Sequence, residues 1–362
     1  MRRLLPVLIA LALLTAASWA QTPTPRATPD DEVIKVSSRL VVVPVSVTDD
    51  KGNPVVGLTA ADFRISEEGR RQTIESVGSA DVVPLEIALL FDVSASTDAM
   101  FRFEQDTAAK FLADVMKPTD RATIFTVGAR GVLVQPRDTA VRSINSIRQI
   151  VPTKEQTAFF DAVSMAADHL KRNAPEGVRK VVVIISDGED TNSEGVIRAI
   201  WNAERKITDD VQGAKLRELR VKARDSAKVA EQAKVVRSLH DADAVFYSIN
   251  PAGSSFQLNK MSVFGQQNMD RFARETGGSA FLPNFLPIDT KDTYQNENNT
   301  RRNQQILDQI FRQLGNELRS QYLIQYYSEA DFPVNRFVKV DIDVPGRSGT
   351  RVRSREGYFV KN

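Results

Sequence analysis

Long apolar runs bounded by polar turns mark the middle of the chain. They are EIALLFD (86–92), RATIFTVG (121–128), KVVVIISDG (180–188) and DAVFYSIN (243–250). Stretches with helical spacing of apolar residues alternate with them, as at 104–116 and 157–173. Continuous apolar strands separated by helices are typical of a parallel sheet that is covered on both faces. The pattern predicts a doubly wound α/β domain with a mainly parallel, Rossmann-like sheet.

Both ends of the chain have a different pattern, in which apolar and polar residues alternate as in half-buried strands. The segments are 39–49, the hairpin 62–77, and then 321–327, 337–344 and 350–360. We expect a β-sandwich built from an N-terminal segment (36–84) and a C-terminal segment (319–362), with the α/β domain (85–318) inserted between them. The alternative is two separate small β extensions that pack on the middle domain.

Three further segments of the middle domain are polar. Residues 191–243 are rich in charge and alanine and predict a helical insertion at about 200–240, which is either a solvated helical face or a docking surface for a partner. Residues 291–305 predict a polar loop, and 304–321 predict the final helix of the domain.

The first twenty residues predict an exported protein. Arg2 and Arg3 precede an apolar stretch that ends with small residues at 18 and 20, as in a signal peptide (1–20) that is cleaved after Ala20. A proline-rich linker (21–35) follows, and no later segment is long and apolar enough to span a membrane after cleavage. The alternative is an uncleaved membrane anchor. We expect a periplasmic or secreted protein.

The composition of the chain excludes several classes of partner and of functional site. Lysine and arginine number 48 against 46 acidic residues, so a formal charge of +2 gives no strong field for steering to nucleic acid or anionic lipid. Cysteine is absent, which excludes disulfides, thiolate nucleophiles and zinc–cysteine sites. A nucleic-acid partner is therefore not expected.

Oxygen-bearing side chains follow the apolar strands. Asp92, Ser94 and Ser96 stand at alternate positions just after the first run, Thr157 precedes a helix, and Asp187 closes another run. Ligands of open α/β sheets bind beyond the carboxyl ends of the strands, and alternate residues of an extended loop point the same way. This oxygen set suits a hard cation.

The five residues resemble the metal-ion-dependent adhesion site of von Willebrand factor type A domains, whose first motif is Asp-x-Ser-x-Ser. The resemblance covers about 85–318, and the phrases GNPVVGLTAADFRISEEG and ELRSQYLIQYY are similar to a related family of secreted bacterial proteins. The helical insertion and the sequence STDAM after the serines depart from that family.

The resemblance implies a Mg²⁺ site, with Ca²⁺ or Mn²⁺ as alternatives. The two serines and the threonine would contact the metal, and the two aspartates would act largely through metal-bound water. An open coordination position would accept an Asp or Glu carboxylate of a partner protein, as in cell adhesion. This is a binding role, with no catalytic residues.

Two other functions compete with this interpretation. A metal-dependent phosphohydrolase could use Asp92 as its nucleophile, but such enzymes generally place a second acidic residue where Ser94 stands. His169 and His240 are interpreted as surface or capping residues, and Glu189 and Asp190 as residues of an exposed loop or helix start. A structural envelope scaffold with a stabilising metal would use the same ligands as an adhesion module.

Overall fold

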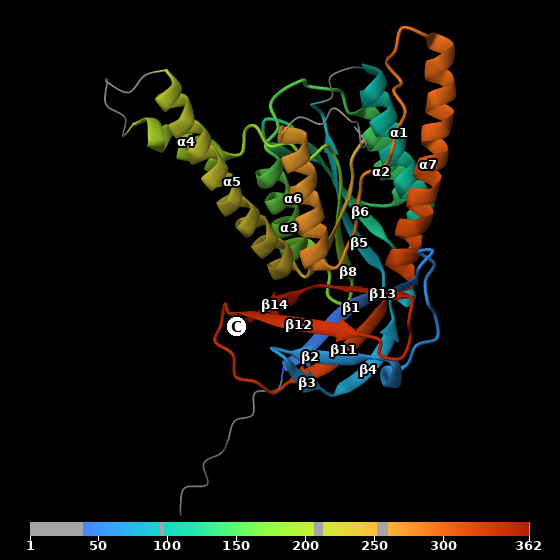
Figure 1. The fold of residues 1–362 in the computed structure, drawn as a ribbon. Coiled ribbons are helices and arrows are strands. Elements are labelled where there is room, and N and C mark those ends of the chain that lie inside the picture. The colour runs from blue at the N-terminus through green and yellow to red at the C-terminus, as the bar shows by residue number, and fades with distance from the viewer. Residues whose placement is uncertain (1–38, 95–97, 206–212, 252–259, 362) are drawn as a thin grey trace, which may run out of the picture. The chain divides into compact units, whose positions relative to one another are not determined.

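The computed structural model describes residues 39–94, 98–205, 213–251 and 260–361. A six-stranded sheet with helices on both faces adjoins two four-stranded antiparallel sheets (Figure 1). The predicted fold class is thereby confirmed, whereas the exact domain boundaries stay a prediction. The signal peptide (1–20) and the linker (21–35) lie outside the described residues.

The six-stranded sheet has the order β10-β9-β8-β5-β6-β7. Its strands are β5 (Leu85–Asp92), β6 (Arg121–Val127), β7 (Gly131–Asp138), β8 (Arg179–Ile185), β9 (Ala244–Ile249) and β10 (Ala280–Phe281). All neighbours are parallel except β6 and β7, which form an antiparallel edge. The apolar runs did not predict β7 because an edge strand with one solvated face lacks a continuous apolar sequence.

Helices cover both faces of this sheet (Figure 1). They are α1 (Asp98–Val115), α2 (Ala140–Gln149), α3 (Phe159–Asn173), α4 (Glu194–Glu204), α5 (Ala214–Ala242), α6 (Lys260–Thr276) and α7 (Thr293–Arg319). Ile87 and Leu89 of β5 pack in the cluster that contains α1, α2 and α7, while Ala88 and Leu90 pack in the cluster with α3, α5 and α6. Among the described helices, none combines the length and apolar character needed to span a bilayer.

Helix α7 corrects the prediction of a polar loop at 291–305. The helix already begins at Thr293, where the Asp292 side chain accepts a hydrogen bond from the Gln295 N–H. Its polar first half is held by side-chain amides: Asn299 donates to the carbonyl of Pro287, and Asn303 donates to the carbonyl of Leu286. These side-chain amides satisfy the backbone carbonyls of the segment before the helix. This face of α7 can therefore be buried although it is polar.

Helix α5 occupies much of the predicted helical insertion. Its C-terminal half is buried in the core through Val235, Val236 and Leu239, while the surface of its N-terminal half is mostly exposed. The residues between α4 and α5 at 206–212 lie outside the described part of the chain.

The two antiparallel sheets have the orders β13-β1-β11-β4 and β14-β12-β2-β3. Their strands are β1 (Arg39–Asp49), β2 (Arg64–Glu67), β3 (Arg70–Gln72), β4 (Ile74–Ser79), β11 (Tyr322–Ser328), β12 (Phe337–Asp343), β13 (Thr350–Ser354) and β14 (Gly357–Phe359). Two short 3-10 helices lie in the connections: η1 (Ala60–Asp62) between β1 and β2, and η2 (Ala80–Val82) between β4 and β5. Each sheet contains strands from both ends of the chain, and their inner faces share one apolar cluster.

A buried carboxylate joins the two antiparallel sheets. Glu67 of β2 accepts hydrogen bonds from the hydroxyls of Tyr326 (2.9 Å), Ser328 (2.8 Å) and Tyr358 (2.6 Å). Its exposed fraction is 2%, so these three hydroxyls replace the water that the carboxylate loses on folding.

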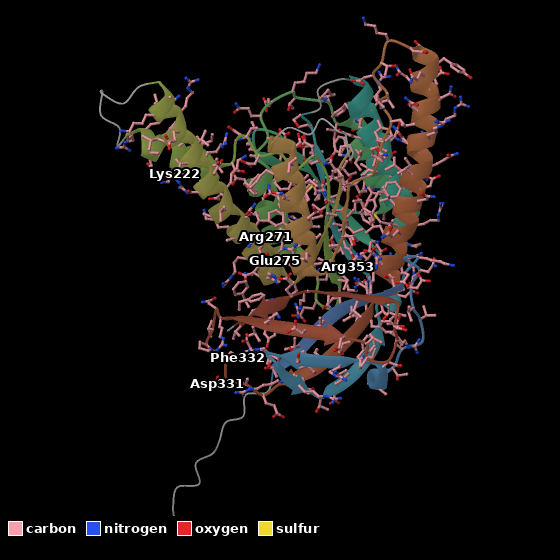
Figure 2. All side chains as sticks on the ribbon, viewed as in Figure 1. Lys222, Arg271, Glu275, Asp331, Phe332 and Arg353 are labelled. Atoms are coloured by element: carbon pink, nitrogen blue, oxygen red, sulfur yellow. The ribbon has the colours of Figure 1, made fainter. Side chains whose placement is uncertain are left out.

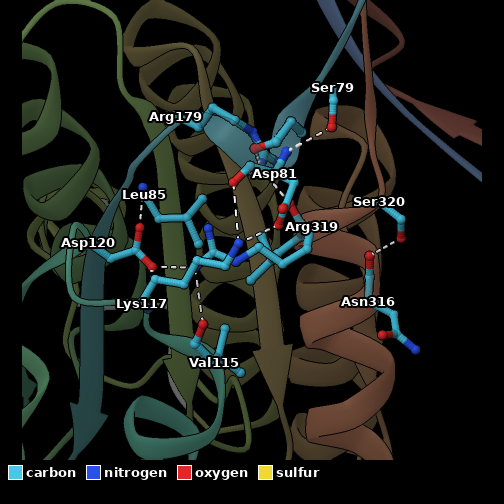
Figure 3. Close-up of polar contacts among 12 residues, drawn as sticks. Ser79, Asp81, Leu85, Val115, Lys117, Asp120, Arg179, Asn316, Arg319 and Ser320 are labelled. Atoms are coloured by element: carbon cyan, nitrogen blue, oxygen red, sulfur yellow. Dashed lines mark hydrogen bonds and ion pairs between the residues drawn. The ribbon is translucent and has the colours of Figure 1, made fainter.

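A second polar network lies where β5 and α7 meet the antiparallel sheets (Figure 3). Asp120 accepts hydrogen bonds from the N–H groups of Leu85 (2.8 Å) and Lys117 (2.7 Å) and forms an ion pair with Arg319. The buried Arg179 donates to the carbonyl of Leu318 and to the side chain of Gln321. Both ends of the inserted segment are therefore fixed by buried, charge-assisted hydrogen bonds.

The structure also corrects the interpretation of His240 as a surface residue. Its exposed fraction is 3%, and its ring makes edge-to-face contacts with Phe337 and Phe359. His169 is half-buried and makes a similar contact with Phe125. The sequence places His240 near the end of a helix, but only the packing of α5 on β12 and β14 buries it.

Candidate functional site

The register of two neighbouring strands brings the candidate residues to one edge of the parallel sheet. Phe91 of β5 pairs with Ile185 of β8. Asp92 is the last residue of β5, and Ser186 and Asp187 directly follow β8. The segments that carry Asp92 and Asp187 therefore emerge side by side at the carboxyl end of the sheet, where ligands of such folds bind.

Asp92 is fixed through both of its carboxylate oxygens. Its Oδ1 accepts hydrogen bonds from the N–H (2.9 Å) and the Oγ (2.6 Å) of Ser94, and its Oδ2 accepts one from the Oγ of Ser186 (2.6 Å). The exposed fraction of Asp92 is 5%. Burial raises the pKa of Asp92, and the bonds from Ser186 and Ser94 act against that rise.

The orientation of the Ser94 hydroxyl has a chemical consequence. A serine hydroxyl has one proton and two lone pairs. Because the Ser94 hydroxyl gives its proton to Asp92, the lone pairs of its Oγ point elsewhere and can coordinate a cation. Ser96, the third residue of the motif, lies outside the described residues.

Asp187 lies in a tight turn that α6 supports. Its Oδ1 accepts a hydrogen bond from the Glu189 N–H (2.9 Å), and Gly188 between them has a φ of +75° that favours glycine. Gly265 of α6 lies directly against this turn, since a Cβ there would be 2.6 Å from the carbonyl oxygen of Asp187. The backbone of α6 thus limits how far Asp187 can move.

The carboxylates at this edge repel one another. Burial, and then the negative charge of Asp92, raise the pKa of Asp187 to about 7, although part of the residue surface is exposed. Glu104 of α1 has an exposed fraction of 6%; burial, and then the charges of Asp92 and Asp187, raise its pKa well above the ordinary range. A cation at this edge would relieve the repulsion.

Thr157 is tied to the segment that follows Asp187. Its N–H donates to the Oγ1 of Thr191 (2.9 Å), and its carbonyl accepts from the N–H groups of Thr191 (2.9 Å) and Asn192 (3.0 Å). Its exposed fraction is 6%. No hydrogen bond joins Thr157 directly to Asp92 or Asp187 within the described part of the chain, so the structure relates it to them through this loop.

Asp190 does not have the exposed position that the sequence suggested. It is buried, with an exposed fraction of 1%, and accepts hydrogen bonds from the N–H of Phe160 (3.2 Å) and from the side chain of Ser193. Phe160 lies in the first turn of α3, whose free N–H groups favour a negative charge. Asp190 therefore fixes the start of α3 beside Thr157.

Sequence reasoning missed two residues of this site. Ser186 precedes Asp187 directly, but its bond to Asp92 depends on the strand register. Glu104 stands between the buried Phe103 and Ala108 of α1, and an acidic residue among apolar ones was the only signal for it.

The donors at this edge fit a hard divalent cation. Buried carboxylates and an oriented hydroxyl are the oxygen ligands that Mg²⁺ accepts. Among the described residues, no cluster of three or more His, Cys, Asp or Glu side chains is arranged to hold a metal. A cation here would therefore need the hydroxyl oxygens in addition to Asp92 and Asp187.

The comparisons with known proteins place this region in a family. The family model described as "von Willebrand factor type A domain" matches residues 87–189. No curated protein matches the chain.

Several solved structures match the chain at low identity. An aerotolerance-related membrane protein from Bacteroides fragilis NCTC 9343 is 15% identical, with 62% of this chain and 99% of that chain covered and a TM-score of 0.33. BatB from Bacteroides thetaiotaomicron is 13% identical over the same shares, also with a TM-score of 0.33. The PilB minor pilin from Streptococcus sanguinis is 12% identical, with 66% of this chain and 63% of that chain covered and a TM-score of 0.41.

Domains of the matched family are often protein-interaction modules, mostly non-catalytic, and commonly bind a divalent metal. The match starts within β5 and ends just after Asp187, so it includes Asp92, Ser94, Ser96, Thr157 and Asp187. Residues 87–189 of this chain thus match the family of von Willebrand factor type A domains.

Proposed function

We propose that the chain is an exported, non-catalytic binding protein, in which Asp92, Ser94, Ser96, Thr157 and Asp187 hold Mg²⁺ and a partner protein supplies an Asp or Glu carboxylate. One observation carries the proposal. Two desolvated carboxylates, Asp92 and Asp187, lie at the ligand-binding edge of the sheet, and the charge of Asp92 adds to burial in raising the pKa of Asp187. A site that keeps repelling carboxylates together is suited to a cation.

The hydrogen bonds of the site define a role for each side chain. Asp92 is held by Ser94 and Ser186, so it would orient the Ser94 hydroxyl rather than move to meet an ion. Asp187 would supply negative charge from a turn that Gly265 supports. Mg²⁺, when bound, would act as a Lewis acid with an open position for an external carboxylate.

A cavity of about 400 Å³ lies next to the proposed site. Val93, which directly follows Asp92, lines it together with residues of β6, β7 and the loop before Thr157. Arg130 and Glu155 also line this cavity, so its wall carries one positive and one negative side chain. A partner whose carboxylate reaches the metal would find room here for the neighbouring side chains.

Calorimetric titration with Mg²⁺ and with Mn²⁺ tests the proposal. We expect one saturable site in the chain that begins at Gln21, and no binding by Asp92→Ala. Asp106→Ala is the matched control, because Asp106 is an exposed carboxylate on α1. Equal binding by Asp92→Ala and Asp106→Ala would refute the site.

A second titration separates adhesion from a structural scaffold. If the metal serves a partner, a soluble carboxylate such as acetate should bind the Mg²⁺-loaded chain and not the chain treated with chelator. If Mg²⁺ raises the melting temperature but no carboxylate binds, the scaffold function is the better interpretation. Turnover of a phosphate ester that is lost in Asp92→Ala would favour the phosphohydrolase instead.

A further inference from the structure

A second cleft lies at the opposite end of the parallel sheet. Its volume is about 470 Å³, and its walls include the starts of β8 and β9, the first half of β1 and the C-terminal segment after β13. Asp92 and Asp187 lie at the carboxyl ends of β5 and β8, so the proposed metal site does not contribute to this cleft. A ligand bound here would be independent of the metal.

One wall of the cleft is a strand with an unpaired edge. Along Arg39–Pro44, β1 pairs with β11 on one side, whereas β13 pairs with the other side only from Val45 onward. After Ser354 the chain leaves this sheet and continues as β14, which pairs with β12. Within the described residues, no strand pairs with this side of Arg39–Pro44.

The backbone groups of Leu40 and Val42 point to the unpaired side. The carbonyl of Val42 accepts a hydrogen bond from the Nη2 of Arg355 (2.7 Å) rather than from β11. Pro44, two residues on, has no N–H to give to β11. Hydrogen-bonding directions alternate along an antiparallel strand, so Leu40 and Val42 share this orientation. Because Arg355 takes the Val42 carbonyl, the edge offers the N–H and C=O groups of Leu40 and the N–H group of Val42. Such groups on an unpaired edge are a template for another strand.

The side chains at this edge are apolar and accessible. Leu40 is 48% exposed and Val42 is 37% exposed, although their neighbours Val41 and Val43 on the same strand are core residues. Val245 and Phe359 line the same cleft. A ligand with apolar side chains would remove this surface from water.

The cleft is strongly cationic. Of the described residues, its lining contains the carboxylate of Asp243 and the cationic side chains of Arg39, Arg179, Lys180, Arg355 and Lys361. Arg355 and Lys361 form ion pairs with Asp243, and Arg179 is occupied by Leu318 and Gln321. Among the described residues, the buried Nη1 of Arg39 has no hydrogen-bond partner. The cleft therefore favours an anionic ligand with acceptor oxygens.

We propose that this cleft binds an extended peptide segment of a partner protein with alternating apolar and acidic side chains, which adds to the sheet as a strand beside Arg39–Pro44. The unpaired edge selects a peptide backbone over other anions, because only a backbone matches a row of N–H and C=O groups. The apolar side chains contact Leu40 and Val42, and the carboxylates lie near Arg39 and Lys180.

Fluorescence polarisation with a labelled hexapeptide, acetyl-Val-Glu-Val-Asp-Val-Glu-amide, tests this proposal on the purified chain. We expect saturable binding that persists in chelator, which separates it from the proposed metal site. A peptide with lysine in place of each acidic residue, and one with N-methyl groups at alternate amides, should each bind at least tenfold more weakly. The first control tests charge, and the second tests strand pairing.

Two charge-reversal variants locate the site. Lys180→Glu should weaken binding at least tenfold, whereas Lys222→Glu should leave it unchanged, because Lys222 is an exposed lysine on the N-terminal half of α5, away from the cleft (Figure 2). If Lys180→Glu fails to fold, amide hydrogen exchange on the unchanged chain gives the same information. The N–H groups of Leu40 and Val42 should exchange more slowly when the peptide is bound.

Three results would overturn the proposal. One is equal affinity of Lys180→Glu and Lys222→Glu for the peptide. Another is unchanged exchange at Leu40 and Val42 in the presence of saturating peptide. The third is displacement of the peptide by decanoate at lower concentration than the unlabelled peptide itself, which would make the natural ligand a small amphipathic carboxylate.

Discussion

His240 should make the stability of this protein depend on pH between about 4 and 6.5. Burial, and then the charge of Arg355, lower the pKa of His240 from its ordinary 6.5 to about 4, while Asp243 and Asp241 act in the opposite direction and Arg237 lowers it further. The folded pKa lies below the unfolded one, so the unfolded chain takes up the proton first. The stabilisation is therefore complete above pH 6.5 and is lost as the pH falls towards 4.

The size of the effect follows from the shift. A difference of 2.5 pKa units corresponds to about 3 kcal/mol in the free energy of unfolding at the acidic end. At pH 5, where the unfolded histidine is largely protonated and the folded one is not, the loss is about 2 kcal/mol. The structural causes are the rings of Phe337 and Phe359, which enclose the imidazole, and the burial of the His240 Nε2, which has no hydrogen-bond partner in the part of the chain that the structure describes.

The assay is urea unfolding followed by circular dichroism at several pH values from 7.5 to 4.5, with His240→Phe as the comparison. Phenylalanine keeps an aromatic ring between Phe337 and Phe359 but cannot take up a proton. All other titratable groups are the same in both chains. The difference between the two free energies of unfolding therefore isolates the contribution of His240. If the two pH profiles run parallel over this range, the burial argument for His240 is wrong.

Three further predictions concern the metal site and the antiparallel sheets. Asp187→Asn removes a repelling carboxylate, so the metal-free variant should melt at the same temperature as the unchanged chain or higher. Mg²⁺ should no longer raise the melting temperature of this variant. An undiminished rise with Mg²⁺ would contradict the assignment of Asp187. Gly265→Ala puts a methyl group against the Asp187 carbonyl and should weaken Mg²⁺ binding about tenfold in calorimetry; an unchanged affinity would show that the turn is free to shift. Glu67→Gln should lower the free energy of unfolding by about 1.5–3 kcal/mol, because charge-assisted bonds to the hydroxyls of the facing sheet are lost. Urea unfolding at pH 7.5 measures this loss, with the exposed Glu68→Gln as control.

The buried strands could be predicted from sequence because their signal is local. The apolar runs locate β5, β6 and β9 to within one residue and extend three residues beyond the end of β8, since strands covered on both faces need apolar side chains at every position. The motif residues Asp92, Ser94 and Asp187 stand at the ends of those runs, so strand order alone suggests that they meet.

The remaining features depend on partners distant in sequence. Asn299 and Asn303 make the first half of α7 look like a loop, because the residues that bind their amides lie before the helix. Asp190 is a surface residue by type, and only the proximity of α3 buries it. Glu104 faces two carboxylates that reach it from other elements.

The pairing of β1 and β2 with strands from the other end of the chain has a consequence for biosynthesis. The hydroxyl of Tyr326 and the carboxylate that it bonds, on Glu67, are separated by 259 residues in sequence. Contacts at such separation form late, because the entropy of closing the loop must be overcome first. Until β11 and β12 have been synthesised, the N-terminal strands expose unpaired edges and apolar faces, the features that chaperones recognise and that drive aggregation. Premature termination within α7 should therefore yield a chain that holds a complete parallel sheet but is captured or degraded through its N-terminal strands.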